Sequence, residues 1–160
     1  MRIIYSGPIL TLPEIFTDIL PDGYNVYVYI SDDNQYGIYI NNTEVELTNL
    51  TSAVGYITFH IDFEEKEINL QFIYSTIKKS GIGHYLMILI AYIGNTFNIK
   101  TILLDDDSKL ARTPNSIYVK LGCEYTDVDP NPEMECSLKL VLSKWDIFKD
   151  KYLNQGFFIE

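Results

Sequence analysis

Apolar and aromatic residues form short runs along the first 75 residues, and polar turn residues separate these runs. A short first strand is predicted at residues 3–5 and a short helix at 12–20, with Pro13 near the helix start. Four further runs are rich in β-branched and aromatic residues, which is typical of strands. They cover residues 26–30, 37–40, 54–61 and 68–74. The short turns between them favour antiparallel pairing.

The pattern changes after residue 80. Residues 81–97 are apolar over a stretch too long and too uniform for a strand, which predicts a buried helix. Residues 100–104 form a short apolar run that ends at three aspartates, which predicts a buried strand. A second helix is expected at 115–121, after Pro114 and before Gly122. Two strands at 123–128 and 135–142 follow, and one or two helical turns are expected in the tail.

This order of elements predicts an α+β fold. A strand–helix–strand unit within an otherwise antiparallel sheet gives one parallel pair of strands. The chain contains no repeat, low-complexity tract or Pro/Gly-rich linker. We therefore expect one domain that covers residues 1–160.

Charge and composition narrow the partners. The 160 residues include 12 basic and 22 acidic side chains, for a net charge of −10. Such a charge repels phosphate backbones and favours cationic partners. Neither a signal peptide nor an apolar run of about 20 residues, as a membrane span requires, is found. We expect a soluble, cytoplasmic protein with no nucleic-acid or membrane partner, with Cys123 and Cys136 as reduced thiols. Because His60 and His84 lie far apart in the sequence, no metal site is expected.

The segment between residues 74 and 84 carries the strongest functional signal. It leaves a predicted strand and enters a predicted helix, whose first N–H groups attract anions. Gly81 and Gly83 lack a Cβ and let a ligand approach the backbone, and Lys78 and Lys79 add positive charge. The segment predicts a phosphate or pyrophosphate site. The alternative is a Gly-rich turn flanked by solvated lysines.

Two blocks of sequence resemble the GNAT superfamily of N-acetyltransferases. Residues 78–83, KKSGIG, are similar to its motif A, [QR]-x-x-G-x-[GA], with Lys78 in place of Gln or Arg. Ile73 takes the apolar position that often precedes this motif. Residues 118–123, YVKLGC, resemble the Y-x-K-L-G-F ending of the family's fourth helix, with Cys123 in place of the aromatic residue. The resemblance covers residues 54–142.

The resemblance implies a GNAT-like fold: a mixed, mostly antiparallel central sheet flanked by helices, with a splayed parallel pair at the cofactor site. It implies acetyl-CoA as cosubstrate and an amine as acceptor. Tyr118 would protonate the leaving thiolate, and a phenol with a pKa near 10 can do so for a thiol with a pKa near 8.5. Ile73 and Ser75 would bind the pantetheine arm. The pyrophosphate would lie on the backbone of Lys78, Lys79, Ser80, Gly81, Ile82, Gly83 and His84.

Other aspects of the function stay open at this point. The general base is one of Glu67, His60, Asp62 and Asp105, or a water molecule. The acceptor is a small molecule or a protein, and the acidic residues 105–107 favour a cationic primary amine. A catalytically degenerate acetyl-CoA-binding sensor or scaffold is the main alternative, and a β-rich interaction module without a ligand is another. The oligomeric state is open, a homodimer included.

Overall fold

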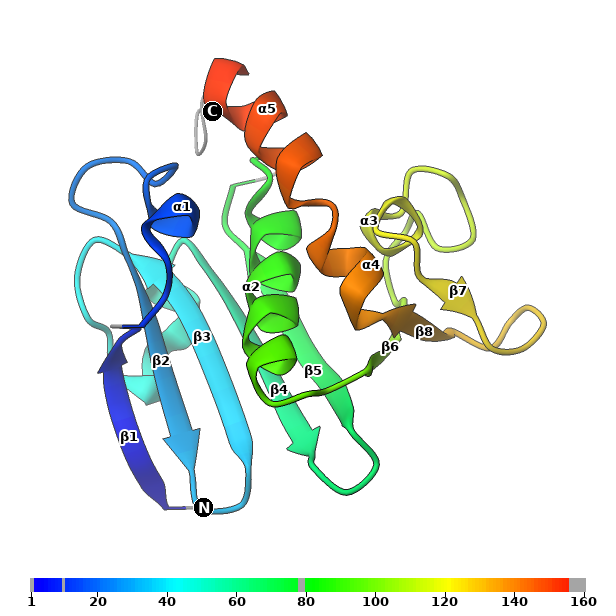
Figure 1. The fold of residues 1–160 in the computed structure, drawn as a ribbon, viewed down its shortest axis with the longest axis horizontal. Helices are drawn as coiled ribbons and strands as arrows, with labels where there is room; N and C mark the ends of the chain where they lie inside the picture. Colours follow the sequence, from blue (N-terminus) through cyan, green and yellow to red (C-terminus); the bar gives the residue numbers. More distant parts are fainter. Residues whose placement is uncertain (1, 10, 78–79, 156–160) are drawn as a thin grey trace.

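The centre of the molecule is an eight-stranded sheet with the order β1-β2-β3-β4-β5-β6-β8-β7 (Figure 1). The computed structural model describes residues 2–9, 11–77 and 80–155, with the last three of these as backbone only. All neighbouring strands are antiparallel except β5 and β6, which are parallel, as the sequence predicted. The strands are β1 (Ile3–Pro8), β2 (Asn25–Ser31), β3 (Gln35–Asn41), β4 (Gly55–Asp62), β5 (Glu67–Ser75), β6 (Thr101–Asp105), β7 (Glu124–Tyr125) and β8 (Glu133–Ser137).

Helix α2 (Ile82–Thr96) packs across one face of the sheet and forms the centre of the core. Its side chains are buried on nearly all sides, as the uniformly apolar sequence predicted. A smaller cluster on the opposite face of the sheet joins Tyr27, Tyr39 and Ala53. The 3₁₀ segment η1 (Leu47–Ser52) packs on that cluster. The sheet is therefore covered on both faces near β3.

The parallel strands β5 and β6 separate after a short paired stretch. Only three pairs join them, from Glu67 with Thr101 to Asn69 with Leu103. On the other side of β5, the register with β4 shifts between Thr58 and Phe59, which leaves Gln71 as a bulge. Bulges bend a strand and increase its local twist. The second half of β5 thus turns away from β6 and opens the sheet at its centre.

The C-terminal third differs most from the sequence prediction. The strand expected at 135–142 is wrong in its second half, because β8 ends at Ser137 and α4 (Leu138–Leu142) begins there. Ser137 caps the helix: its side-chain oxygen accepts a hydrogen bond from the Leu140 N–H. Leu138 and Val141 are buried. Their spacing of three puts both on one face of a helix, whereas it would put them on opposite faces of a strand.

The tail forms a longer helix than predicted. Helix α5 (Trp145–Gln155) lies beside the start of α2 (Figure 1). Trp145, Phe148 and Tyr152 stand three and four residues apart, and their rings contact one another along one side of α5. Three other elements are shorter than predicted: α1 (Glu14–Thr17), α3 (Ile117–Lys120) and β7.

Cys123 and Cys136 form a disulfide, so the prediction of reduced thiols is wrong. The pairing of Glu124 with Glu135 places the two cysteines opposite each other, with a Cα–Cα distance of 4.2 Å. This register comes from tertiary structure and could not be read from the spacing of the cysteines. Among the described residues, none of the helices has both the length and the apolar character needed to span a bilayer.

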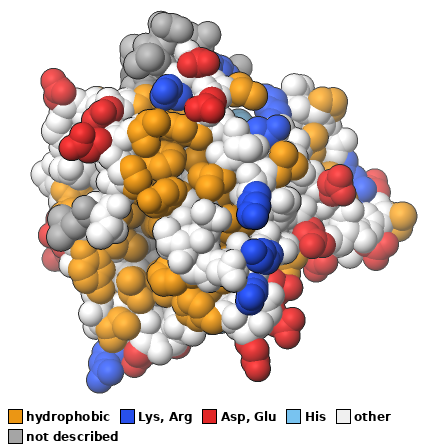
Figure 2. Space-filling model, viewed as in Figure 1, with side chains coloured by type: hydrophobic (Ala, Val, Ile, Leu, Met, Phe, Trp, Pro, Cys, Tyr) orange, Lys and Arg blue, Asp and Glu red, His pale blue; other side chains and the backbone are white. Residues whose placement is uncertain are grey.

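Charge is distributed unevenly over the surface. On the face that carries α2, apolar side chains gather between α1 and α2, and Lys and Arg side chains form a column over α4 (Figure 2). Acidic side chains lie mainly around the edge of this view. On this face, the basic and the acidic side chains are thus largely separated.

Candidate functional site

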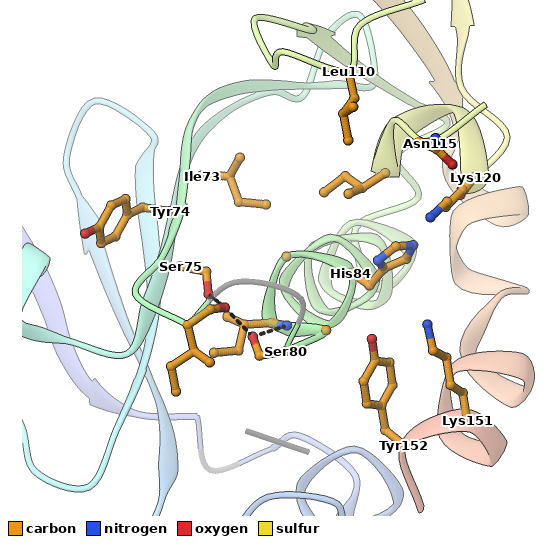
Figure 3. A pocket seen from close by; sticks show the side chains of 15 residues that line it. Ile73, Tyr74, Ser75, Ser80, His84, Leu110, Asn115, Lys120, Lys151 and Tyr152 are labelled. Carbon is orange, nitrogen blue, oxygen red and sulfur yellow. Dashed lines mark hydrogen bonds between the residues drawn. The ribbon is translucent and has the colours of Figure 1, made fainter. Parts of the chain in front are cut away.

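A cavity of about 860 Å³ opens where β5 leaves β6 and α2 begins (Figure 3). Residues from the end of β5 and from the start of α2 form two of its walls, and α3 and α5 complete it. The lining residues are Ile73, Tyr74, Ser75, Ile77, Ser80, Gly81, Ile82, Gly83, His84, Leu110, Asn115, Ile117, Lys120, Lys151 and Tyr152.

Seven of the nine predicted cofactor residues line this cavity: Ile73, Ser75, Ser80, Gly81, Ile82, Gly83 and His84. The structure therefore brings the strand end and the glycine motif together around one space. Lys78 and Lys79 lie outside the described residues. The cavity is also lined by residues outside the predicted set: Tyr74, Ile77, Leu110, Asn115, Ile117, Lys120, Lys151 and Tyr152.

Two serines shape the loop between β5 and α2. Ser75 and Ser80 each donate a hydrogen bond of 2.8 Å to the carbonyl of Ile77, and Ser80 Oγ accepts the Ile82 N–H at 3.3 Å. Gly81 precedes the helix with a φ of 85°, a conformation that favours glycine. The N–H groups of the first helical turn lack acceptors within the helix. Gly83 and His84, in that turn, line the cavity.

Gly83 keeps this part of the cavity open. A Cβ at this position would lie 3.1 Å from Ile117 Cδ1 and 3.9 Å from Ile73 Cδ1. Both isoleucines line the cavity, so a side chain on residue 83 would project between its walls. Any residue with a side chain at position 83 would therefore narrow the cavity beside the start of α2.

Positive charge surrounds the same end of the cavity. The side chains of Lys120, Lys151 and His84 come from α3, α5 and α2 and point toward one another (Figure 3). Burial lowers the pKa of His84 to about 4, and the charges of Lys120 and Lys151 add to this effect. His84 is therefore neutral at pH 7.

A second pocket of about 380 Å³ lies between the separated strands. Ile73 lines both this pocket and the large cavity, so the two spaces meet at that side chain. Two exposed carboxylates, Asp105 and Asp107, line the pocket, and so does Tyr118. The remaining lining residues are Leu70, Gln71, Phe72 and Ser108.

Tyr118 is positioned by the short helix α3 at the junction of the two spaces. Ile117 and Lys120 of this helix line the large cavity, whereas Tyr118 lines the small pocket. Burial raises the pKa of the Tyr118 phenol, and the charges of Asp106 and Asp107 raise it further. In the part of the chain that the structure describes, the hydroxyl makes no hydrogen bond. Tyr118 is thus a neutral phenol with a proton to donate.

Asp106 differs from its two neighbours. The sequence grouped residues 105–107 at the acceptor side, but Asp106 is only 2% exposed and does not line the pocket. Its carboxylate accepts hydrogen bonds from the hydroxyls of Ser108, Ser116 and Tyr125 at 2.6, 2.7 and 2.8 Å. Burial works to raise the pKa of Asp106, but these hydrogen bonds outweigh it and hold the pKa below its ordinary value. Since Ser116 directly precedes α3, Asp106 anchors the helix that carries Tyr118.

The structure also separates the candidates for the general base. Asp105 lines the small pocket. Glu67 and Asp62 pair with each other at the opposite end of β4 and β5 from the loop that leads into α2. His60 pairs with Asn69, and these three candidates line neither of the two spaces. Asp105 is the candidate that the fold brings to the pocket.

No protein-family model and no curated protein matches the chain. Solved structures do match. An acetyltransferase of the GNAT family from Staphylococcus aureus Mu50 is 15% identical, with 67% of this chain and 70% of that chain covered and a TM-score of 0.52. PaiA N-acetyltransferase from Thermoplasma acidophilum, solved in complex with coenzyme A, is 17% identical, with 65% and 61% covered and a TM-score of 0.49. GCN5 from Tetrahymena is 19% identical, with 67% and 70% covered and a TM-score of 0.43.

Together with the sheet topology, the similarity to the Staphylococcus aureus structure shows the fold. The chain has the GNAT fold: an open, mostly antiparallel sheet with one parallel pair, β5 and β6, flanked by helices.

Proposed function

We propose that this chain is an acyltransferase that moves an acetyl group from acetyl-CoA to an amine by direct attack. One observation carries the proposal: the large cavity at the start of α2 continues at Ile73 into the pocket that holds Tyr118. The GNAT fold and the two motif blocks are consistent with this function.

The residues of the large cavity fit the phosphate-bearing arm of the donor. The backbone of Ile73 to Ser75 does not pair with β6 and is free on that side for the pantetheine amides. The first turn of α2 offers N–H groups beside Gly83 to the pyrophosphate. When bound, acetyl-CoA supplies the reactive thioester.

Tyr118 has the properties of the general acid for the transfer step. The amine nitrogen forms a bond to the thioester carbonyl carbon, the C–S bond breaks, and the Tyr118 hydroxyl donates its proton to the sulfur. The resulting phenolate regains a proton from the amine by way of solvent. A phenol with a raised pKa stays protonated over the whole range in which an amine becomes neutral.

The small pocket favours a cationic primary amine as acceptor. Asp105 and Asp107 line it, and none of its described lining residues is basic. Carboxylates raise the local concentration of a cation. Asp105 or a water molecule would accept the proton that the ammonium group must lose before attack.

The test combines binding and turnover. Acetyl-CoA should stabilise the protein, by about 2.7 kcal/mol when present at about 100 times its dissociation constant. Primary amines should release free thiol from acetyl-CoA. Gly83→Val should abolish the stabilisation, because the new side chain enters the cavity between Ile117 and Ile73. Gly81 is less informative: a Cβ there would lie 2.5 Å from the Tyr152 ring, on a backbone with positive φ.

The outcomes distinguish three cases. Stabilisation with thiol release supports the transferase. Stabilisation without release from any amine in a broad panel would indicate a sensor or scaffold instead. Absence of stabilisation by any coenzyme A species would contradict both. The melting temperature of Gly83→Val without ligand checks that this variant folds.

A further inference from the structure

Three basic side chains meet at the large cavity without a carboxylate among them. Lys120, Lys151 and His84 line both this cavity and an adjoining one of about 230 Å³. Neither space has an Asp or Glu among its described lining residues. The residues come from α3, α5 and α2, so only the tertiary structure brings them together (Figure 3).

Among the described residues, neither lysine of this cluster makes a salt bridge. Both lysines line the same two spaces as His84, and their charges add to the effect of burial in lowering the pKa of its ring. The only contact found for the Lys151 ammonium among described residues is the Tyr152 ring, 5.1 Å away. Both lysines are exposed, so solvent screens the repulsion between them, and an anion that enters the cavity would pair with both ammonium groups.

We propose that Lys120, Lys151 and His84 form a phosphate site for the donor, in addition to the backbone at the start of α2. The inference rests on the proposed function and deepens it. The site makes the cavity selective for an acyl group carried on coenzyme A over one carried on pantetheine alone. The phosphate comes either from the pyrophosphate or from the 3′-phosphate of the nucleotide, and both share the same chemistry.

Helix α5 supplies Lys151, one of the three side chains of this site. Tyr152 packs over Gly81, since a Cβ on that glycine would lie 2.5 Å from the tyrosine ring. Phe148 of the same helix stacks near His84, with ring centroids 6.5 Å apart. These contacts fix α5 against the start of α2 and bring Lys151 to the cavity. The C-terminal helix is therefore a part of the donor site, which the resemblance over residues 54–142 does not cover.

The experiment compares three acetyl donors, each tested with wild type, three site variants and one control variant. Acetyl-CoA, acetyl-dephospho-CoA and acetyl-pantetheine are titrated by calorimetry and assayed as donors, with wild type, Lys120→Met, Lys151→Met and the double variant. Lys149→Met is the matched control, because it removes the same charge from α5 at a residue that lines neither cavity. Each of the two site variants should weaken acetyl-CoA binding about fivefold, and the double variant more than tenfold. The kcat/KM with acetyl-pantetheine should not change.

Acetyl-dephospho-CoA separates the two sources of phosphate. If the double variant loses affinity for acetyl-CoA but not for acetyl-dephospho-CoA, the site holds the 3′-phosphate. If it loses affinity for both equally, the site holds the pyrophosphate. Either result supports the proposal.

Two results overturn the phosphate site. One is that the double variant binds acetyl-CoA as tightly as Lys149→Met does. The other is that it loses acetyl-pantetheine turnover to the same extent. Both leave the proposed function intact, whereas a wild type that binds no coenzyme A species contradicts the function itself. Lys120→Gln and Lys151→Gln repeat the test should the methionine variants melt at a lower temperature.

Discussion

The large cavity and the small pocket share a wall but have opposite charge. The large cavity is lined by two lysines and a neutral histidine, and the small pocket by two aspartates and a neutral tyrosine. They meet at Ile73 and at α3, where Ile117 and Lys120 line the large cavity and Tyr118 lines the small pocket. Charge is thus segregated over the length of one helical turn.

This segregation matches the two proposed substrates. The donor carries three phosphate groups, and the acceptor is proposed to be an ammonium ion. A net charge of −10 alone would repel such a donor. Basic residues placed at one cavity overcome that repulsion locally, because fields between charges are screened beyond about 10 Å at 0.1 M salt. The net charge of an acidic chain therefore does not exclude an anionic ligand that binds in a basic cavity.

Removal of the Tyr118 hydroxyl is the strongest test of the junction between the two spaces. Tyr118→Phe should lower kcat by about 10²–10⁴-fold, which is typical for the loss of a general acid. Acetyl-CoA affinity should not change, because Tyr118 does not line the large cavity. In wild type the rate should rise with pH toward the pKa of the acceptor amine. It should not fall again below pH of about 10, because the Tyr118 pKa is raised.

Ser116→Ala provides the matched comparison for Tyr118→Phe. It removes a hydrogen bond to Asp106 at the start of α3 and leaves the phenol in place. A kcat for Tyr118→Phe within tenfold of wild type, with the chemical step shown to be rate-limiting, would make Tyr118 a packing residue. The proposed transfer would then need another acid.

Neutralisation of the acidic pocket should give a smaller effect. Asp105→Asn and Asp107→Asn should each raise the KM for a diamine about threefold, because both carboxylates are exposed and screened by solvent. The KM for acetyl-CoA should stay the same. Steady-state assays with a diamine at 0.05 and 0.5 M salt would show the effect shrink as salt increases. Asp106 is excluded from this test, since its substitution would disturb α3.

Glu65→Gln is the control for the aspartate variants. It removes the same charge on the exposed turn between β4 and β5, at the opposite end of β5 from the loop that enters α2. If all three variants changed the KM equally, the effect would come from net charge and not from the pocket. A preference of wild type for neutral or anionic amines would contradict the charge comparison altogether.

The first two thirds of the fold could be predicted from the sequence, because the local pattern of apolar residues there agrees with the tertiary structure. The strands up to β5, helix α2 and the parallel pair followed from periodicity and turn residues. The strand predicted at 135–142 was wrong in its second half, because Leu138, Leu140 and Leu142 alternate as in a strand although these residues form α4. The length of α5 also escaped prediction, because its burial depends on contact with α2.

The site shows the same division. The glycine motif predicted one wall of the large cavity, because its residues are adjacent in the sequence. Lys151 could not be predicted, since it lies 67 positions after His84 and reaches it only through the packing of α5. Lys120 lies within the second motif block, residues 118–123, but nothing in the local sequence indicated that its side chain faces the cavity. Asp106 was grouped with its neighbours because a run of three aspartates does not indicate which of them is buried.

The smallest expected effect concerns the titration of His84 within the basic cluster. The titratable groups that line the adjoining cavity with His84 are Lys120 on α3, Lys144 before α5, and Lys151 and Tyr152 on α5. In the folded protein the pKa of His84 is lowered to about 4, against about 6.5 in an unfolded chain. The unfolded state therefore binds more protons between these values, and stability falls as the pH decreases from 6.5 to 4.

A phosphate bound at the cluster should offset the lysine charges and raise the pKa of His84. The affinity for acetyl-CoA should therefore increase as the pH decreases from 6.5 to 4. Melting temperatures of wild type and His84→Gln, with and without acetyl-CoA from pH 7 to 4, measure both effects. The variant should lose less stability without ligand and gain less from it at low pH. Parallel curves for the two proteins would show that the ring does not sense the phosphate, and would place the anion away from the cluster.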